Sequence, residues 1–226
     1  MPRIARIIAQ GFPHHVIQRG NNHQQVFFDD DDRHTYIAFL QKYGRETDCD
    51  VMAFCLMPNH VHVLAVPHTD ESLSKFMQKL SLTYTQHVNR KYNRTGRLWE
   101  CRFFSSLIER QTYLWRVCRY IERNPVRHAL IERPEEYTWS SAGMKYAFVA
   151  AAWDSAEEKQ KYCEFMQQPE VPEDVECIRK SIRGCRPVGN EAFIETVSNS
   201  IGINLKFRPR GRPRKQTIKS GQPVAV

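Results

Sequence analysis

Two apolar runs joined by three residues constrain the fold of this chain more than any other feature. "VMAFCL" occupies residues 51–56, "HVHVLAV" occupies residues 60–66, and "MPN" between them places a proline where turns favour it. The pattern predicts an antiparallel hairpin inside a sheet, with His60 and His62 at the start of its second strand. Because alternate residues of a strand point to one face, both imidazoles should project together. Two neighbouring imidazoles fit a bound cation, and they also fit ordinary sheet residues satisfied by hydrogen bonds.

The other elements follow from periodicity and turn signals. We expect strands in "PHHVIQRGN" and "RLWECRFFSSLIE", and helices that start at "FFDDDDRH", after a capping Asp70, and near Gln111, the last ended by Pro125. The order strand, helix, hairpin, helix, strand, helix predicts an α+β fold, an antiparallel sheet with helices packed against it.

The domain formed by these elements should span residues 1–150. Short helices are expected beyond it in "DSAEEKQKYCEFMQ" and "GNEAFIETVSNSIGI", separated by "PEVPED". They would form a helical extension over residues 151–205. Residues 206–226 are too basic and too poor in apolar side chains to pack, so this tail should be disordered when alone.

The net charge of +8 is unevenly distributed along the chain. Residues 1–150 carry 20 Lys and Arg against 15 Asp and Glu, residues 151–200 carry 6 against 10, and residues 201–226 carry 7 basic residues and no acidic one. A basic surplus gathered in two places suggests a polyanionic partner, usually nucleic acid. The alternative is a solvated face plus a solubilising tail.

The composition also bounds the class of protein. Hydrophobic residues make up 41% of the chain and charged residues 26%, as in a soluble globular protein. No run is long and apolar enough to cross a bilayer, and "MPRIARIIAQGF" is too short and polar for a secretory signal. The seven cysteines are scattered without a CxxC pair, so we expect reduced thiols in a cytoplasmic protein.

One helix, "QTYLWRVCRYIERN", places a tyrosine and an amide along one edge. Tyr120 falls at the margin of its buried stripe, and Asn124, four residues later, lies on nearly the same side. Arg116, Arg119 and Arg123 lie nearby and are candidate DNA contacts. The ordinary interpretation is a tyrosine at the edge of the core and an asparagine that caps the helix.

Taken together, these motifs resemble a known family. "MPNHVHVL", followed about sixty residues later by "RYIERNPVRHAL", is similar to the HUH-type single-tyrosine transposases of insertion sequences, and most of all to their REP-associated branch. "PHHVIQRGNN" and "WECRFFSSLI" resemble that family's first strand and the strand before its tyrosine helix. The likeness covers roughly residues 10–145.

The resemblance implies both a fold and a chemistry. The fold would be a ferredoxin-like sheet, with the tyrosine helix packed so that its phenol faces the histidines. His60 and His62 would be metal ligands, Asn124 would complete the metal site, and Tyr120 would be the nucleophile. An amide, a phosphate and water around two imidazoles suit Mg²⁺ or Mn²⁺, whereas a structural zinc site would want a cysteine nearby.

The implied reaction is strand cleavage and rejoining of single-stranded, hairpin-forming DNA through a covalent 5′-phosphotyrosine. Relatives include dimers in which the tyrosine of one chain serves the metal site of the other, so a homodimer is one expected arrangement. The alternative is a retired transposase that only binds DNA or regulates.

The tail carries a second candidate DNA contact. "RPRGRPRK" resembles an AT-hook, whose arginines enter the narrow minor groove of A·T tracts. The alternative is a tail that binds polyanions without specificity. The basic residues of this motif are Arg208, Arg210, Arg212, Arg214 and Lys215.

Overall fold

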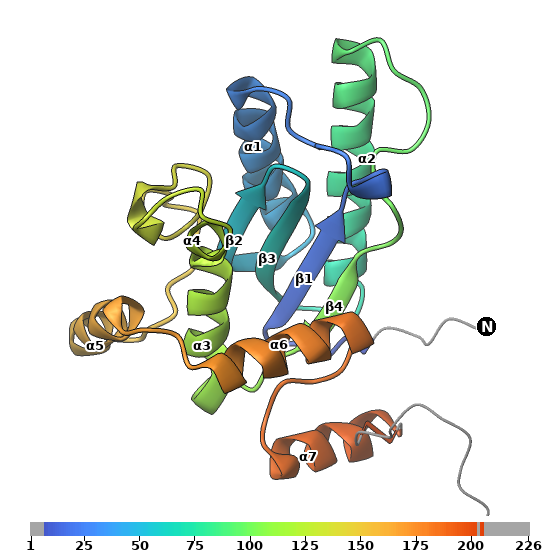
Figure 1. Cartoon of the computed structure of the whole chain (residues 1–226). Helices are drawn as coiled ribbons and strands as arrows, with labels where there is room; N and C mark the ends of the chain where they lie inside the picture. The colour runs from blue at the N-terminus through green and yellow to red at the C-terminus, as the bar shows by residue number, and fades with distance from the viewer. Residues whose placement is uncertain (1–6, 203, 206–226) are drawn as a thin grey trace, which may run out of the picture.

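The computed structural model describes residues 7–202, 204 and 205, which form a four-stranded antiparallel sheet and seven α-helices (Figure 1). The strands are β1 (His14–Arg19), β2 (Cys49–Met57), β3 (His60–Pro67) and β4 (Phe104–Leu107). The helices are α1 (Asp30–Glu46), α2 (Ser72–Lys91), α3 (Arg110–Glu122), α4 (Asn124–Arg127), α5 (Ala156–Gln167), α6 (Pro172–Gly184) and α7 (Glu191–Ile201). Two short 3-10 helices lie at Asn21–His23 and Pro134–Glu136.

The strand order β2-β3-β1-β4, with the chain order β1-α1-β2-β3-α2-β4, is that of a ferredoxin-like fold. Each neighbouring pair of strands is antiparallel. The predicted α+β, ferredoxin-like class is therefore confirmed. The predicted hairpin is present as β2 and β3, joined by the turn at Pro58 and Asn59, and it lies beside the central strand β1.

Alternation along β3 divides its side chains between the two faces of the sheet. Val61 and Val63 are fully buried in the core that also contains Phe76 and Leu80 of α2. Leu64 lies in the second core, with Val117 and other residues of α3. Figure 1 shows α1 and α2 behind the sheet and α3 in front of it. The even-numbered residues of β3, including both histidines, therefore face α3.

The C-terminal extension differs from the expectation. It contains three helices, because "PEVPED" is not a plain separator but holds the start of α6. Pro172 occupies the first turn of α6, and Glu173 and Asp174 lie there too, where the helix dipole favours negative charge. Figure 1 shows α6 crossing in front of the sheet, and it contacts β1, β4 and α3.

Three smaller expectations are also corrected. The strand predicted over "RLWECRFFSSLIE" is only four residues long. Asp70 does not cap α2, whose N-cap residue is Glu71 without a side-chain cap bond. Pro125 does not simply end the tyrosine helix, since α3 ends at Glu122 and a new short helix begins at Asn124.

Two general features complete the description. None of the seven cysteines, all of which fall within the described residues, forms a disulfide. Within the same residues, no helix combines the length and the apolar character needed to cross a membrane.

Candidate functional site

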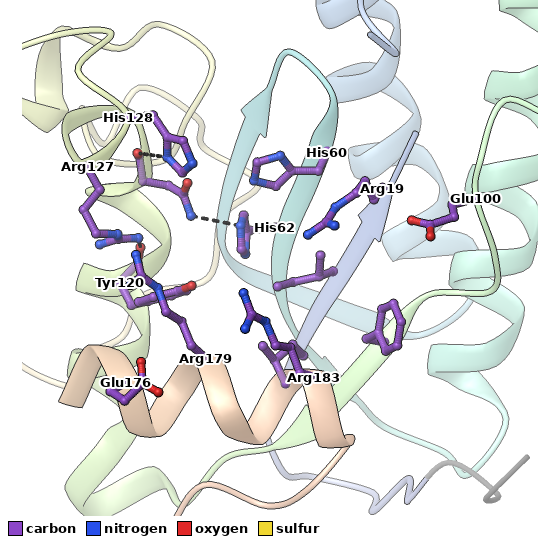
Figure 2. Close-up of a pocket in the computed structure, with 14 residues that line it drawn as sticks. Arg19, His60, His62, Glu100, Tyr120, Arg127, His128, Glu176, Arg179 and Arg183 are labelled. Carbon is purple, nitrogen blue, oxygen red and sulfur yellow. Dashed lines mark hydrogen bonds between the residues drawn. The ribbon is translucent and has the colours of Figure 1, made fainter. Parts of the chain in front are cut away.

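A cavity of about 550 Å³ lies between the sheet, α3, α4 and α6. It collects most of the chemically active residues named above, and Figure 2 shows their side chains around one space. The titratable and amide side chains that line it include His60, His62, Tyr120, Asn124, Arg127, His128, Arg19, Arg179 and Arg183.

The two histidines of β3 point into this cavity from the sheet. Their ring centroids lie 5.0 Å apart. His60 is partly exposed, and its Nδ1 bonds the Asn59 side-chain oxygen at 2.7 Å, which leaves Nε2 available. His62 is buried, and it uses both ring nitrogens within the site.

His15 of β1 and Asn124 of α4 hold the His62 ring from both sides. His15 Nε2 lies 2.9 Å from His62 Nδ1, and Asn124 Nδ2 lies 2.9 Å from His62 Nε2. Register explains the first contact, because His62 pairs with Ile17 across β1 and β3, and His15 shares the face of Ile17. The Asn124 side chain is thus a partner of His62 and not a cap of α3.

Tyr120 closes the site from α3. Its ring centroid lies 5.9 Å from that of His62 and 5.7 Å from that of His15, and only 6% of the residue is exposed. The guanidinium of Arg127 lies 4.2 Å from the Tyr120 ring centroid and donates to the Tyr120 carbonyl. A single chain therefore brings the tyrosine, both histidines and the amide together.

Burial keeps the imidazoles neutral. It lowers the pKa of His62 well below its usual value, and the neighbouring His60, His15, Arg127 and His128 add to the shift. Burial, with the charges of His128 and Arg19, lowers the pKa of His60 to about 4, and burial with Arg127 lowers that of His15 to about 3. Neutral imidazole is the form that binds a metal ion.

The residues present fit a divalent cation. Asn124 Oδ1 is buried without a hydrogen-bond partner among the described residues, so an acceptor is left over beside His62. A turn of the amide about its axis would place Oδ1 about 2.9 Å from His62 Nε2. Two adjacent ligands of an octahedral ion with bonds of about 2.1 Å have that spacing.

No group of three or more His, Cys, Asp or Glu residues in the described part of the chain is placed to hold a metal ion. The candidate ligands are therefore the two imidazoles and the Asn124 amide, which leaves coordination positions open for other oxygen atoms.

The three arginines predicted to contact DNA from the tyrosine helix have protein partners in the structure. Arg116 forms an ion pair of 2.8 Å with Asp174, and Arg123 lies 3.8 Å from Glu170. Arg119 is buried and donates to the Phe165 carbonyl at 3.1 Å. These three arginines lie against the acidic extension, although the Arg116 side chain is still 37% exposed, and their DNA contact stays a prediction.

Several residues that line the cavity, and one that lies directly behind it, are not indicated by the sequence patterns described above. His15 was seen only as part of a strand, although its alternation with Ile17 places it on the His62 face. Arg127 and His128 follow Asn124 directly and lie in the motif already singled out. Arg179 and Arg183 were missed because α6 itself was missed. The predicted tail contacts (Arg208, Arg210, Arg212, Arg214 and Lys215) lie outside the described residues and stay a prediction.

The sequence and the fold of this chain both resemble those of known transposases. Residues 10–124 match the family model described as IS200-like transposases. A Haemophilus influenzae protein assigned as a REP-associated tyrosine transposase is 28% identical over 119 residues, which are 48% of this chain and 65% of that protein's length.

A solved REP-associated tyrosine transposase, bound to a REP hairpin, superposes with a TM-score of 0.55 at 17% identity over 69% of this chain and 92% of that chain. This likeness shows the shared fold. Since the family model covers just over half of the sequence and includes both histidines, Tyr120 and Asn124, the chain belongs to the IS200-like transposase family.

Proposed function

We propose that this chain is a metal-dependent DNA transposase that cleaves and rejoins single-stranded DNA beside hairpins, with Tyr120 as nucleophile. The observation that carries the proposal is the convergence of Tyr120, His60, His62 and Asn124 on one cavity of one chain. Its family membership supports a role in DNA transposition. The solved relative's REP hairpin supports hairpin DNA as the substrate class.

The reaction proposed for Tyr120 exchanges one phosphodiester for another. Its phenol oxygen attacks the phosphorus, a bond from phosphorus to the phenol oxygen forms, and the bond from phosphorus to the 3′ oxygen breaks. The phenol proton is lost and the leaving 3′ oxygen gains one, so the products are a 5′-phosphotyrosine and a free 3′-hydroxyl. A second 3′-hydroxyl can reverse the step, which joins strands without ATP.

His60, His62 and Asn124 would hold Mg²⁺ or Mn²⁺, which supplies positive charge to the non-bridging oxygens of the phosphate. His15 fixes the orientation of His62 through their 2.9 Å bond. Arg127 holds the Tyr120 ring by a cation–π contact, and only 6% of Tyr120 is exposed. The ring is therefore fixed in place before DNA binds.

The test uses labelled hairpin-containing single-stranded DNA, Mg²⁺ or Mn²⁺, and a denaturing gel. We expect label attached to the protein, loss of attachment when EDTA is added, and none in a Tyr120→Phe variant. Tyr113→Phe, on the same helix but outside the cavity, is the matched control and should react normally. DNA binding without attachment, on hairpins from the repeats of its own genome, would favour the retired, DNA-binding alternative.

A further inference from the structure

The helix α6 forms one wall of the cavity, although it belongs to the extension and lies beyond the 10–124 segment matched by the family model. Glu176, Arg179, Ile182 and Arg183 line the cavity from this helix. Figure 2 shows the guanidinium groups of Arg179 and Arg183 pointing from α6 towards His62 and Tyr120. The site is therefore lined both by the segment that matches the family model and by a helix outside that segment.

Specific contacts hold α6 in that position. Its first turn is bound to α3 by the ion pair between Asp174 and Arg116, and the segment just before it is bound to α4 by the 2.5 Å contact between Glu170 and Arg127. After the helix, Val188 pairs with Ile108, and its backbone bonds the carbonyl of Leu107. The apolar side of α6 is buried through Ile178 and Ile182.

These contacts pair arginines of α3 and α4 with acidic residues of the extension, and they place two further arginines of α6 in the lining of the cavity. The acidic residues of the extension neutralise the arginines of α3 and α4, and α6 then presents two new ones to the cavity. Within the described residues, the side chains of Arg179 and Arg183 make no hydrogen bond or ion pair, and the same holds for Arg19 on the opposite wall. All three are exposed.

The cavity therefore has a surplus of positive charge. Its lining contains four arginines and two glutamates, Glu100 and Glu176. Glu176 lies 3.4 Å from Lys180, and Arg127 is paired with Glu170. Unpaired guanidinium groups that point at a nucleophile have an anion as their natural partner, and a phosphate accepts two of their hydrogen bonds at once.

We propose that Arg179 and Arg183 of α6, with Arg19 of β1, bind the backbone phosphates of the DNA strand that is to be cleaved. The proposal rests on the proposed function, because it assigns positioning residues to that reaction. Arg179 and Arg183 are four residues apart and lie one above the other on one side of α6, about 6 Å apart along its axis. They can thus contact successive phosphates while Arg19 faces them across the cavity.

The experiment compares wild type, Arg179→Ala/Arg183→Ala, the charge-preserving Arg179→Lys/Arg183→Lys, and the control Lys75→Ala/Lys161→Ala. The control removes two exposed, ion-paired lysines from α2 and α5, outside the cavity. The probes are a hairpin oligonucleotide with a single-stranded flank and the same hairpin without the flank. Affinity is measured at several salt concentrations, in EDTA so that no cleavage occurs.

For the flanked hairpin, we expect the alanine variant to bind roughly 10- to 100-fold more weakly than wild type. The slope of log affinity against log salt should shrink by about 1.4, because each lost phosphate contact on a single strand contributes about 0.7. The lysine variant should restore most of the slope. The hairpin without a flank should bind all four proteins alike.

A neutral methylphosphonate, placed at each flank linkage in turn, identifies the phosphates concerned. At one or two linkages the neutral group should lower the affinity of the wild-type protein for the flanked hairpin, and it should leave the affinity of the alanine variant unchanged. With metal present, that variant should form the tyrosine adduct more slowly at low DNA concentration, and saturating DNA should recover most of the rate.

The outcomes separate the two proposals. If the wild-type protein forms no adduct, the proposed function fails. The arginine proposal is still tested in that case, because the salt dependence of DNA binding is compared between wild type and the alanine variant without cleavage. If wild type forms the adduct and the alanine variant matches it in slope and rate, the arginine proposal alone fails. An alanine variant that reacts faster than wild type would also overturn it, since α6 would then cover the site and not bind its substrate.

Discussion

The buried carboxyl of Glu122 gives a quantitative test of how the extension docks on α3. It is 5% exposed, and it accepts hydrogen bonds from Ser141 at 2.6 Å and from Tyr162 of α5 at 3.3 Å. Burial raises the pKa of Glu122 from its ordinary 4.5 to about 7, and the two hydrogen bonds only partly oppose that shift. The carboxyl lies where the core domain meets the extension.

The sign of the effect follows from linkage. In the unfolded chain the carboxyl ionises near pH 4.5, and in the folded chain it ionises near pH 7. Between these values the folded state binds more protons, so this group lowers the free energy of unfolding as the pH rises. The difference between pKa values of 4.5 and about 7, at about 1.36 kcal/mol for each factor of ten in the ionisation constant, lowers the free energy of unfolding by about 3 kcal/mol at pH 7 and above.

Glu122→Gln removes this ionisation and keeps a polar side chain of similar size. We expect the free energy of unfolding of the variant, minus that of the wild type, to increase by about 3 kcal/mol as the pH rises from 4.5 to 8. The buried histidines act in the opposite direction below pH 6.5, but they are present in both proteins and cancel in the difference.

Urea unfolding at several pH values measures that difference. Glu157→Gln, an exposed carboxyl on α5 paired with Lys161, is the control. Parallel stability curves for wild type and Glu122→Gln would refute the reasoning, because they would mean that the carboxyl titrates alike in the folded and unfolded chains.

Three further predictions concern the site and the core. His15→Phe should lower the affinity for Mn²⁺, measured by calorimetry, about 10- to 100-fold, because His62 loses the partner that orients it. An unchanged affinity would mean that the His15 side chain only fills space. Leu80→Ala should cost about 2–5 kcal/mol in urea unfolding, since Leu80 is fully buried, whereas Leu82→Ala, at a residue 56% exposed, should cost about 0.5 kcal/mol or less. An equimolar mixture of Tyr120→Phe and His62→Ala should form no adduct if one chain supplies both parts of the site, as its geometry favours; restored activity would show exchange between two chains.

The sequence by itself determined the sheet and the chemical motifs. Alternation over residues 60–66 was enough to place His60 and His62 on one face, because side-chain direction in a strand depends only on local backbone geometry. The buried hairpin and the order of strands and helices then limited the fold to an antiparallel sheet with covering helices. Helical spacing likewise placed Tyr120 at the edge of its helix.

Tertiary structure decided which residues surround those motifs. His15 reaches His62 only through the pairing of β1 with β3, which joins two residues 47 positions apart in the sequence. The start of α6 did carry a local signal, Pro172 followed by Glu173 and Asp174, and Ile178 and Ile182 continue it at helical spacing. No local sequence signal indicated that α6 lies across the cavity.

The arginines show the same division most clearly. Spacing alone placed Arg116, Arg119 and Arg123 near the tyrosine, but it gave no information about the acidic extension that covers them. Periodicity reports which side chains share a face, whereas the partner of that face depends on contacts between distant segments. For this reason the sequence identified Tyr120 as a candidate nucleophile together with the two histidines, and only the folded chain showed which arginines in the cavity have no protein partner among the described residues.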